Sequence, residues 1–190
     1  MAKPARATLI RGDGIGPEIA DATVRAARRA LEPIGTLGLW HYSVKESLVL
    51  GVEGALLRND IETAEEFLAM IDSLPAARRT RFLQAHSHRL RAQLAERRGD
   101  SHLVQPAFEA AVGRFREVSL PFWLAVTLLQ ESEWLHAHHR GSEAVALLTE
   151  SRGIFQRLAA TPWLERAEKL PSIEPSSGGK PDLELASDRH

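Results

Sequence analysis

Turn-like residue pairs recur at a nearly constant spacing through this chain, and that spacing restricts its fold more than any other feature. The pairs are Asn59-Asp60, Gly99-Asp100 and Arg140-Gly141, and each follows the previous one after about 40 residues. Ladders of small and apolar residues at helical spacing follow them, but they start less regularly, so we expect extra residues in the second junction. A repeat of this length, made of two helices, is typical of an α-solenoid. The ladders are Ala64, Phe67, Leu68, Ile71; Ala107, Phe108, Ala111, Val112, Phe115; and Ala144, Leu147, Leu148, Ile154.

The composition of the 190 residues is that of an ordinary water-soluble protein, with 44% hydrophobic and 26% charged residues. A formal net charge of −1 gives no field that would attract nucleic acid or an anionic membrane, so we expect neither as a partner. The absence of cysteine excludes disulfides and thiolate metal sites. No apolar run is long enough for a signal peptide or a membrane span, and we expect a soluble cytoplasmic protein.

Residues 1–38 differ in kind from the rest of the chain. The β-favouring run Ala7–Ile10 precedes a glycine loop, and Pro17 then opens a helix that we expect to reach about Leu31. This loop is either structural or an anion site, because free N–H groups and a helix dipole favour an anion. With no second strand to pair with, the unit is expected to be dispensable, so that deleting residues 1–38 leaves the helical fold largely intact. The candidate cofactor-binding residues are Gly12, Asp13, Gly14 and Gly16.

The stretch A-T-L-I-R-G-D-G-I-G-P-E-I-A-D-A-T at positions 7–23 resembles the amino-terminal βα unit of the isocitrate/isopropylmalate dehydrogenase family. The resemblance implies a loop near a nicotinamide cofactor. It gives an alternative function, a family protein or fragment that binds NAD(P) or a 2-hydroxy acid. The family's later substrate arginines, acid–base groups, metal-binding aspartates and nucleotide loop have no recognisable counterpart, and Tyr42 stands in a different context. We therefore expect no dehydrogenase activity and no cofactor.

Seven helices are expected beyond the linker, from apolar periodicity and from residues that favour helix ends. Asp60 is a predicted N-cap, Gly99 a predicted C-cap and Leu74-Pro75 a break. Pro106 leaves two interpretations, because the fourth helix begins either at Ser101 or, after a longer junction, at Pro106. The expected ranges are 44–58, 60–73, 77–98, 101–118, 121–139, 142–159 and 163–169, within a repeat domain of residues 39–170. The predicted disordered tail is 171–190.

Five segments within residues 42–169 resemble the terminal tetratricopeptide-like repeats of large bacterial regulators. Those proteins join a nucleotide-cyclase or DNA-binding module to a signalling ATPase and then to helical repeats. The resemblance implies a mostly α fold of about three tetratricopeptide-like hairpins and a sensory or scaffold role. The pattern departs at His138-His139-Arg140, where a turn glycine is expected before the arginine. The segments are R-N-D-I-E-T-A-E-E-F-L, A-E-R-R-G-D, P-A-F-E-A-A-V-G-R-F-R-E, P-F-W-L-A-V-T-L-L-Q-E-S-E-W-L and A-T-P-W-L-E-R-A.

Several patterns invite a chemical role, and for each we favour a structural one. His136 and His139 share a face of an expected helix, but a stable metal site needs three or four ligands. Ser132, Glu133 and His136 fall within one turn, yet nothing indicates an oxyanion hole. We expect no catalytic residue and no metal. The basic run Arg78, Arg79, Arg81, Arg89 and Arg91 is expected to be a solvated face, and Phe122, Trp123, Trp134, Phe155 and Trp163 an inter-helix core.

The first helix of each stacked hairpin usually lines the concave face of such an array. Here those helices are 44–58, 77–98 and 121–139. Their polar residues form a mixed-charge set that suits a peptide or a partner helix, although the alternative is a merely solvated face. We therefore expect a non-catalytic protein–protein interaction module with a protein or peptide partner. The candidate partner-binding residues are Glu46, Arg81, His88, Arg91, Gln130 and Glu133.

Overall fold

The computed structural model describes residues 17–31 and 42–171, which are mostly helical and contain no β-strand. The predicted strand Ala7–Ile10, the glycine loop and residues 172–190 of the predicted tail lie outside the described residues. The helix predicted from Pro17 to Leu31 is confirmed. The helices are α1 Pro17–Leu31, α3 Tyr42–Leu57, α4 Ile61–Ser73, the short 3-10 helix η1 Ala76–Arg78, α5 Arg81–Arg98, α6 Ser101–Glu117, α7 Pro121–Ala137, α8 Gly141–Arg157 and α9 Thr161–Glu168.

The α-helices from α4 to α9 start at equal intervals, at positions 61, 81, 101, 121, 141 and 161. Two consecutive helices therefore form a unit of about 40 residues, a length typical of helical-hairpin repeats. The prediction of extra residues in the second junction is wrong, because residues 101–105 form the first turn and a half of α6. Pro106 lies inside that helix. The buried neighbours Val104 and Phe108 anchor this turn, which offsets the hydrogen bond that proline cannot donate.

One turn geometry closes five of the helices. In each, the N–H after a residue of positive φ donates to the carbonyl five positions earlier, at 2.8–3.2 Å. This bond satisfies a carbonyl that the helix end leaves free. His139 takes the position where the sequence pattern predicted a glycine, so the third turn keeps the common shape. The residues of positive φ are Asn59 (58°), Gly99 (80°), Ser119 (53°), His139 (59°) and Ala159 (51°).

Hydroxyl and carboxylate caps set two of the helix starts. Asp60 Oδ1 accepts from the Thr63 N–H at 3.1 Å, which confirms Asp60 as the N-cap of α4. That hydrogen bond is also the main reason why the pKa of Asp60 is lowered. The expected start of the third helix at residue 77 is wrong, because η1 occupies Ala76–Arg78. The Thr80 hydroxyl then caps α5 by accepting from the Leu83 N–H at 3.4 Å.

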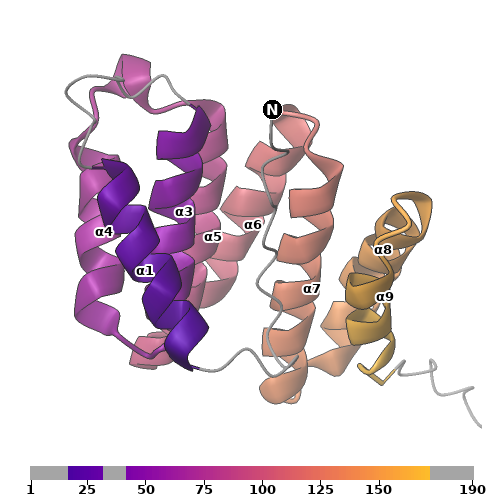
Figure 1. The fold of residues 1–190 in the computed structure, drawn as a ribbon. Helices are drawn as coiled ribbons and strands as arrows, with labels where there is room; N and C mark the ends of the chain where they lie inside the picture. Colours follow the sequence, from indigo (N-terminus) through magenta and orange to yellow (C-terminus); the bar gives the residue numbers. More distant parts are fainter. Residues whose placement is uncertain (1–16, 32–41, 172–190) are drawn as a thin grey trace, which may run out of the picture.

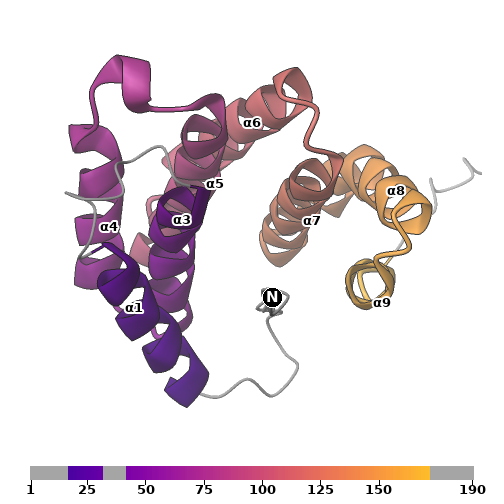
Figure 2. The ribbon, with the colours of Figure 1, turned by 45° about the horizontal axis from the view of Figure 1, so that its top comes forward.

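The helices follow an arc, with α3, α5 and α7 toward its inside and α4, α6 and α8 toward its outside (Figures 1 and 2). Three clusters of buried apolar side chains hold the arc together. One joins α1, α3, α4 and α5, one joins α5 to α9, and the third joins α5, α6, α7 and α8. Helix α5 contributes to all three clusters and so links the two ends. We call the side of α3, α5 and α7 that faces the inside of the arc the inner side.

Helix α1 packs on α3 and completes the first core cluster. Gly54 of α3 permits this approach, because a Cβ there would lie 3.1 Å from Val24 Cγ2 and 3.2 Å from the Ala20 carbonyl oxygen. Removing α1 would expose the apolar surface that it covers, and such exposure costs about 25 cal/mol per Å². This packing therefore does not support the expectation that residues 1–38 are dispensable. Two ion pairs also hold α1, one between Asp21 and Arg58 after α3 at 2.7 Å and one between Arg28 and Glu66 of α4 at 2.6 Å.

Candidate binding surfaces

A buried arginine joins three helices on the inner side. Arg89 of α5 is only 1% exposed, so the predicted solvated face is wrong at this residue. Its guanidinium forms an ion pair with Glu53 of α3 and donates to Gln130 Oε1 of α7 at 3.3 Å. It also lies 5.0 Å from the ring centroid of Trp123. A carboxylate, an amide and an aromatic face thus compensate the buried charge. These contacts fix neighbouring hairpins relative to one another.

His86 lies one turn before Arg89 and is fully buried. Burial, and then the charge of Arg89, holds the pKa of His86 well below its usual value, so the imidazole is neutral at pH 7. Its Nδ1 lies 3.2 Å from Arg89 Nη2, which can only donate, so the proton resides on Nε2. The rings of Phe82, Phe115 and Trp123 enclose the imidazole at centroid distances of 4.4, 5.0 and 4.5 Å. We assign His86 a structural role.

Three of the predicted partner-binding residues belong to the inner side. Glu46 is half-buried and shares a face of α3 with Glu53, two turns further on. Gln130 accepts hydrogen bonds from the buried arginine and from the neighbouring Gln93 amide of α5. Glu133 is occupied, because both of its carboxylate oxygens accept from the Arg166 guanidinium of α9, at 2.7 and 2.6 Å.

The other three predicted partner-binding residues lie on α5, on a different face from Arg89. Arg81, His88 and Arg91 follow one another at spacings of two turns and one turn, which places them on one helical face. Arg91 forms an ion pair with Asp72 of α4, so this face points toward α4. The structure therefore splits the predicted set between two surfaces. Whether either surface binds a partner stays a prediction.

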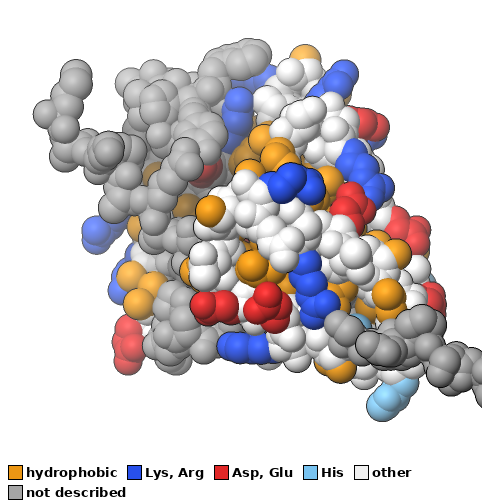
Figure 3. Space-filling model, turned by 90° about the vertical axis from the view of Figure 1, so that its right-hand side faces the viewer, with side chains coloured by type: hydrophobic (Ala, Val, Ile, Leu, Met, Phe, Trp, Pro, Cys, Tyr) orange, Lys and Arg blue, Asp and Glu red, His pale blue; other side chains and the backbone are white. Residues whose placement is uncertain are grey.

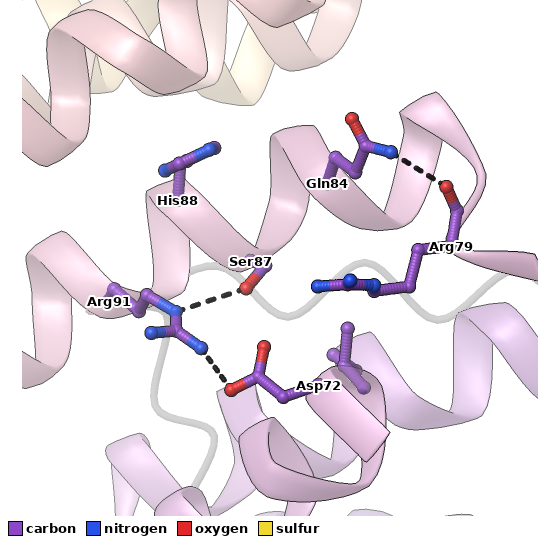
Figure 4. Close-up of a pocket in the computed structure, with 7 residues that line it drawn as sticks. Asp72, Arg79, Gln84, Ser87, His88 and Arg91 are labelled. Atoms are coloured by element: carbon purple, nitrogen blue, oxygen red, sulfur yellow. Dashed lines mark hydrogen bonds and ion pairs between the residues drawn. The ribbon is translucent and has the colours of Figure 1, made fainter. Parts of the chain in front are cut away.

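A polar cleft of 340 Å³ lies between the end of α4, η1 and α5 (Figure 4). Arg91 forms its ion pair with Asp72 here, and its Nε donates to the Ser87 hydroxyl at 3.2 Å. Gln84 donates to the backbone carbonyl of Arg79 at 2.8 Å and so fixes the segment between η1 and α5. The lining residues of this α4–α5 cleft are Ile71, Asp72, Arg79, Gln84, Ser87, His88 and Arg91.

Positive charge exceeds negative charge in the α4–α5 cleft. Among its lining residues Asp72 is the only acid, and it is paired with Arg91. Arg79 is half-buried, and its guanidinium forms no ion pair or hydrogen bond with any other residue that the structure describes. Burial lowers the pKa of His88, and the charges of Arg91 and Arg114 lower it further. In the sequence Arg79 belongs to the basic run that we expected to be a solvated face, and Asp72 looks like an ordinary surface residue near a helix end, so neither indicated this cleft.

Glu131 of α7 is a second buried charge that the sequence did not reveal. Its side chain is 3% exposed, and burial, followed by the nearby Glu109 carboxylate, raises its pKa to about 7, against the opposing influence of Arg140. The group therefore changes protonation near neutral pH. It lies between α6 and α7, away from the α4–α5 cleft.

The histidines considered as metal ligands are not arranged as the sequence suggested. His139 follows the end of α7 with a φ of 59°, so it does not share a helical face with His136. No group of three or more possible metal ligands occurs in residues 17–31 and 42–171. The Ser132 hydroxyl donates to the Leu128 carbonyl, so it is not directed at His136. The candidate cofactor-binding residues Gly12, Asp13, Gly14 and Gly16 lie outside the described residues.

The end of the arc at α8 and α9 carries mixed side chains, with apolar atoms scattered among basic and acidic ones (Figure 3). Val145 of α8 is 39% exposed and Leu158, after the same helix, is 43% exposed. Their separation along the helix axis is about 20 Å at 1.5 Å per residue, so these two residues do not form one patch. Within the described ranges, no helix has the length and apolarity that spanning a membrane requires.

Comparisons of the chain with models of protein families, with curated proteins and with solved structures give no match.

Proposed function

We propose that this chain is a non-catalytic protein-interaction module, an α-solenoid of about three tetratricopeptide-like hairpins that binds a peptide or partner helix along its inner side. The observation that carries the proposal is the equal spacing of the starts of α4 to α9. Equivalent hairpins stacked in this way form an extended surface, which arrays of this kind use for binding. The mixed-charge residues of α3, α5 and α7 suit a polypeptide partner.

The inner side is also rigid, which favours binding over a purely solvated role. Arg89 ties α3, α5 and α7 together, and the Glu133–Arg166 ion pair ties α7 to α9. A surface held in one conformation loses less entropy when it receives a ligand. Glu96 lies two turns after Arg89 on the same face of α5. Glu46 and Glu96 remain available there, because neither side chain has a hydrogen bond or ion pair within the described part of the chain.

A peptide selection with a matched charge control tests this proposal. Peptides are selected from a random display library on the full chain, and their affinities are then measured for variants. The double variant Glu46→Lys with Glu96→Lys changes the inner side, and Glu165→Lys with Glu168→Lys makes the same charge change on the exposed face of α9. We expect the first to weaken binding at least about tenfold, or about 1.4 kcal/mol, and the second to leave it unchanged. Failure to select a peptide, or an equal loss in both variants, contradicts the proposal.

A further inference from the structure

We infer that the α4–α5 cleft is a binding site for a small oxyanion, a phosphate or carboxylate group, with Arg79 as its principal ligand. The site lies on a different face of α5 from Arg89, and its existence does not depend on peptide binding at the inner side. It assigns a function to the guanidinium of the half-buried Arg79, which has no hydrogen bond or ion pair with another described residue.

The geometry of the cleft presents donors to one point. The guanidinium groups of Arg79 and Arg91 extend toward one another from opposite sides, and the Ser87 hydroxyl and Asp72 carboxylate lie between them (Figure 4). Guanidinium is suited to this ligand, because its planar N–H groups match the two oxygens of a carboxylate or phosphate. Ser87 accepts from Arg91 Nε, and its own hydroxyl hydrogen is free to donate to an anion.

The electrostatic surroundings favour the same ligand. Arg79 directly precedes Thr80, the N-cap of the long helix α5, so the positive end of this helix dipole lies beside it. The exposed Arg81, the first residue of α5, adds positive charge near this position. Asp72 and the carboxyl end of α4 act in the opposite sense. Because the Asp72 carboxylate already occupies Arg91, an entering anion competes with it for that guanidinium but not for Arg79.

The size of the cleft agrees with a small group. Its 340 Å³ is at the lower end of the range of about 300–1,000 Å³ that small-molecule sites occupy. Ile71 is the one apolar residue among those that line the cleft, and it is only 1% exposed.

Titration of the full chain with inorganic phosphate or acetate, at constant ionic strength with chloride as the reference anion, tests the inference. Backbone amide shifts of residues 84–91 report the site. We expect saturable shifts with at least one of the two oxyanions and none with chloride. Arg79→Ala is expected to weaken binding about tenfold, the usual scale for a charge-assisted hydrogen bond. Arg79→Lys, which keeps the charge but loses the planar fork, is expected to weaken it less.

Arg78→Ala is the matched control, because it removes the same charge from an exposed side chain at the preceding position. It is expected to leave the affinity within about twofold, whereas Asp72→Asn is expected to tighten binding by removing the competing carboxylate. Amide spectra confirm that each variant is folded. Absence of saturable shifts, equal weakening by Arg78→Ala and Arg79→Ala, or the same response to chloride would overturn the inference.

Discussion

Three glycine-to-alanine substitutions test the turns and the helix packing with one chemical change. Gly99 ends α5 with a φ of 80°, whereas Gly113 lies within α6 with nothing within 4 Å of an added Cβ. Gly51 of α3 faces the Phe67 ring, whose nearest atoms would lie 2.6–2.8 Å from that Cβ. The same methyl group therefore enters a strained turn, an open helix surface and a filled core.

The expected changes in the free energy of unfolding differ in sign. A Cβ in left-handed backbone costs about 1–2 kcal/mol, and the stiffer unfolded chain offsets about 0.4–1 kcal/mol, so Gly99→Ala loses about 1 kcal/mol. Gly113→Ala gains about 1 kcal/mol from helix propensity. Gly51→Ala gains the same propensity but costs about 1–3 kcal/mol in overpacking against a fully buried ring, for a net loss of about 1 kcal/mol.

Urea and thermal unfolding followed by circular dichroism measure these changes. For a chain of this size, about 1 kcal/mol corresponds to roughly 2–4 °C in the melting midpoint. The midpoint of Gly113→Ala is expected above that of the parent, and the midpoints of Gly99→Ala and Gly51→Ala below it. A rise of the midpoint in Gly99→Ala would refute the assignment of left-handed backbone at Gly99, and a fall in Gly113→Ala would refute the open helix surface at Gly113.

Three further predictions concern buried charge and α1. The Glu131 carboxyl has a pKa of about 7 in the folded chain against 4.5 as its ordinary value, so wild-type stability falls as pH rises between these values. In Glu131→Gln that fall in stability should be absent. Urea titrations should therefore show the stability of the variant, relative to wild type, increasing by up to about 3 kcal/mol from acid to above pH 7. Parallel pH profiles of variant and wild type would contradict this. Arg89→Ala is expected to lose about 3–5 kcal/mol by leaving Glu53 without its buried partner, and a loss under about 1 kcal/mol would show that the network is unimportant. Deleting residues 1–31 should lower the melting midpoint, and Gly54→Ala should lower it less, because the added methyl group would press on Val24; an unchanged midpoint for the deletion would show that α1 does not stabilise the other helices.

Local signals predicted most of the helical layout, because they act within a few residues. Gly99 favours left-handed backbone and Asp60 favours an N-cap position, and each residue occupies the predicted position in the structure. Ser119 and Ala159 adopt the same turn without such a preference, so the neighbouring helices must impose it. Pro106 suggested a longer junction before α6, but its position inside the helix depends on the burial of its neighbours, which local signals do not reveal.

Long-range packing explains what the sequence did not reveal. Arg89 belongs to a basic run that is typical of a solvated face, and only the approach of α3 and α7 buries it. The face of α5 that carries His88 and Arg91 could not be assigned from periodicity alone, because α5 is covered on nearly every side. Helix α1 was predicted as an element, but its docking on α3 depends on the space that Gly54 leaves.

Backbone nuclear magnetic resonance of the full chain tests the equal spacing of the helix starts, on which the proposed binding module rests. Helical chemical shifts are expected throughout residues 101–105, together with positive φ at the five residues that each close a helix: Asn59, Gly99, Ser119, His139 and Ala159. Non-helical shifts at residues 101–105, or extended backbone at Ser119, His139 and Ala159, would contradict the proposed module, because the hairpins would then not be equivalent.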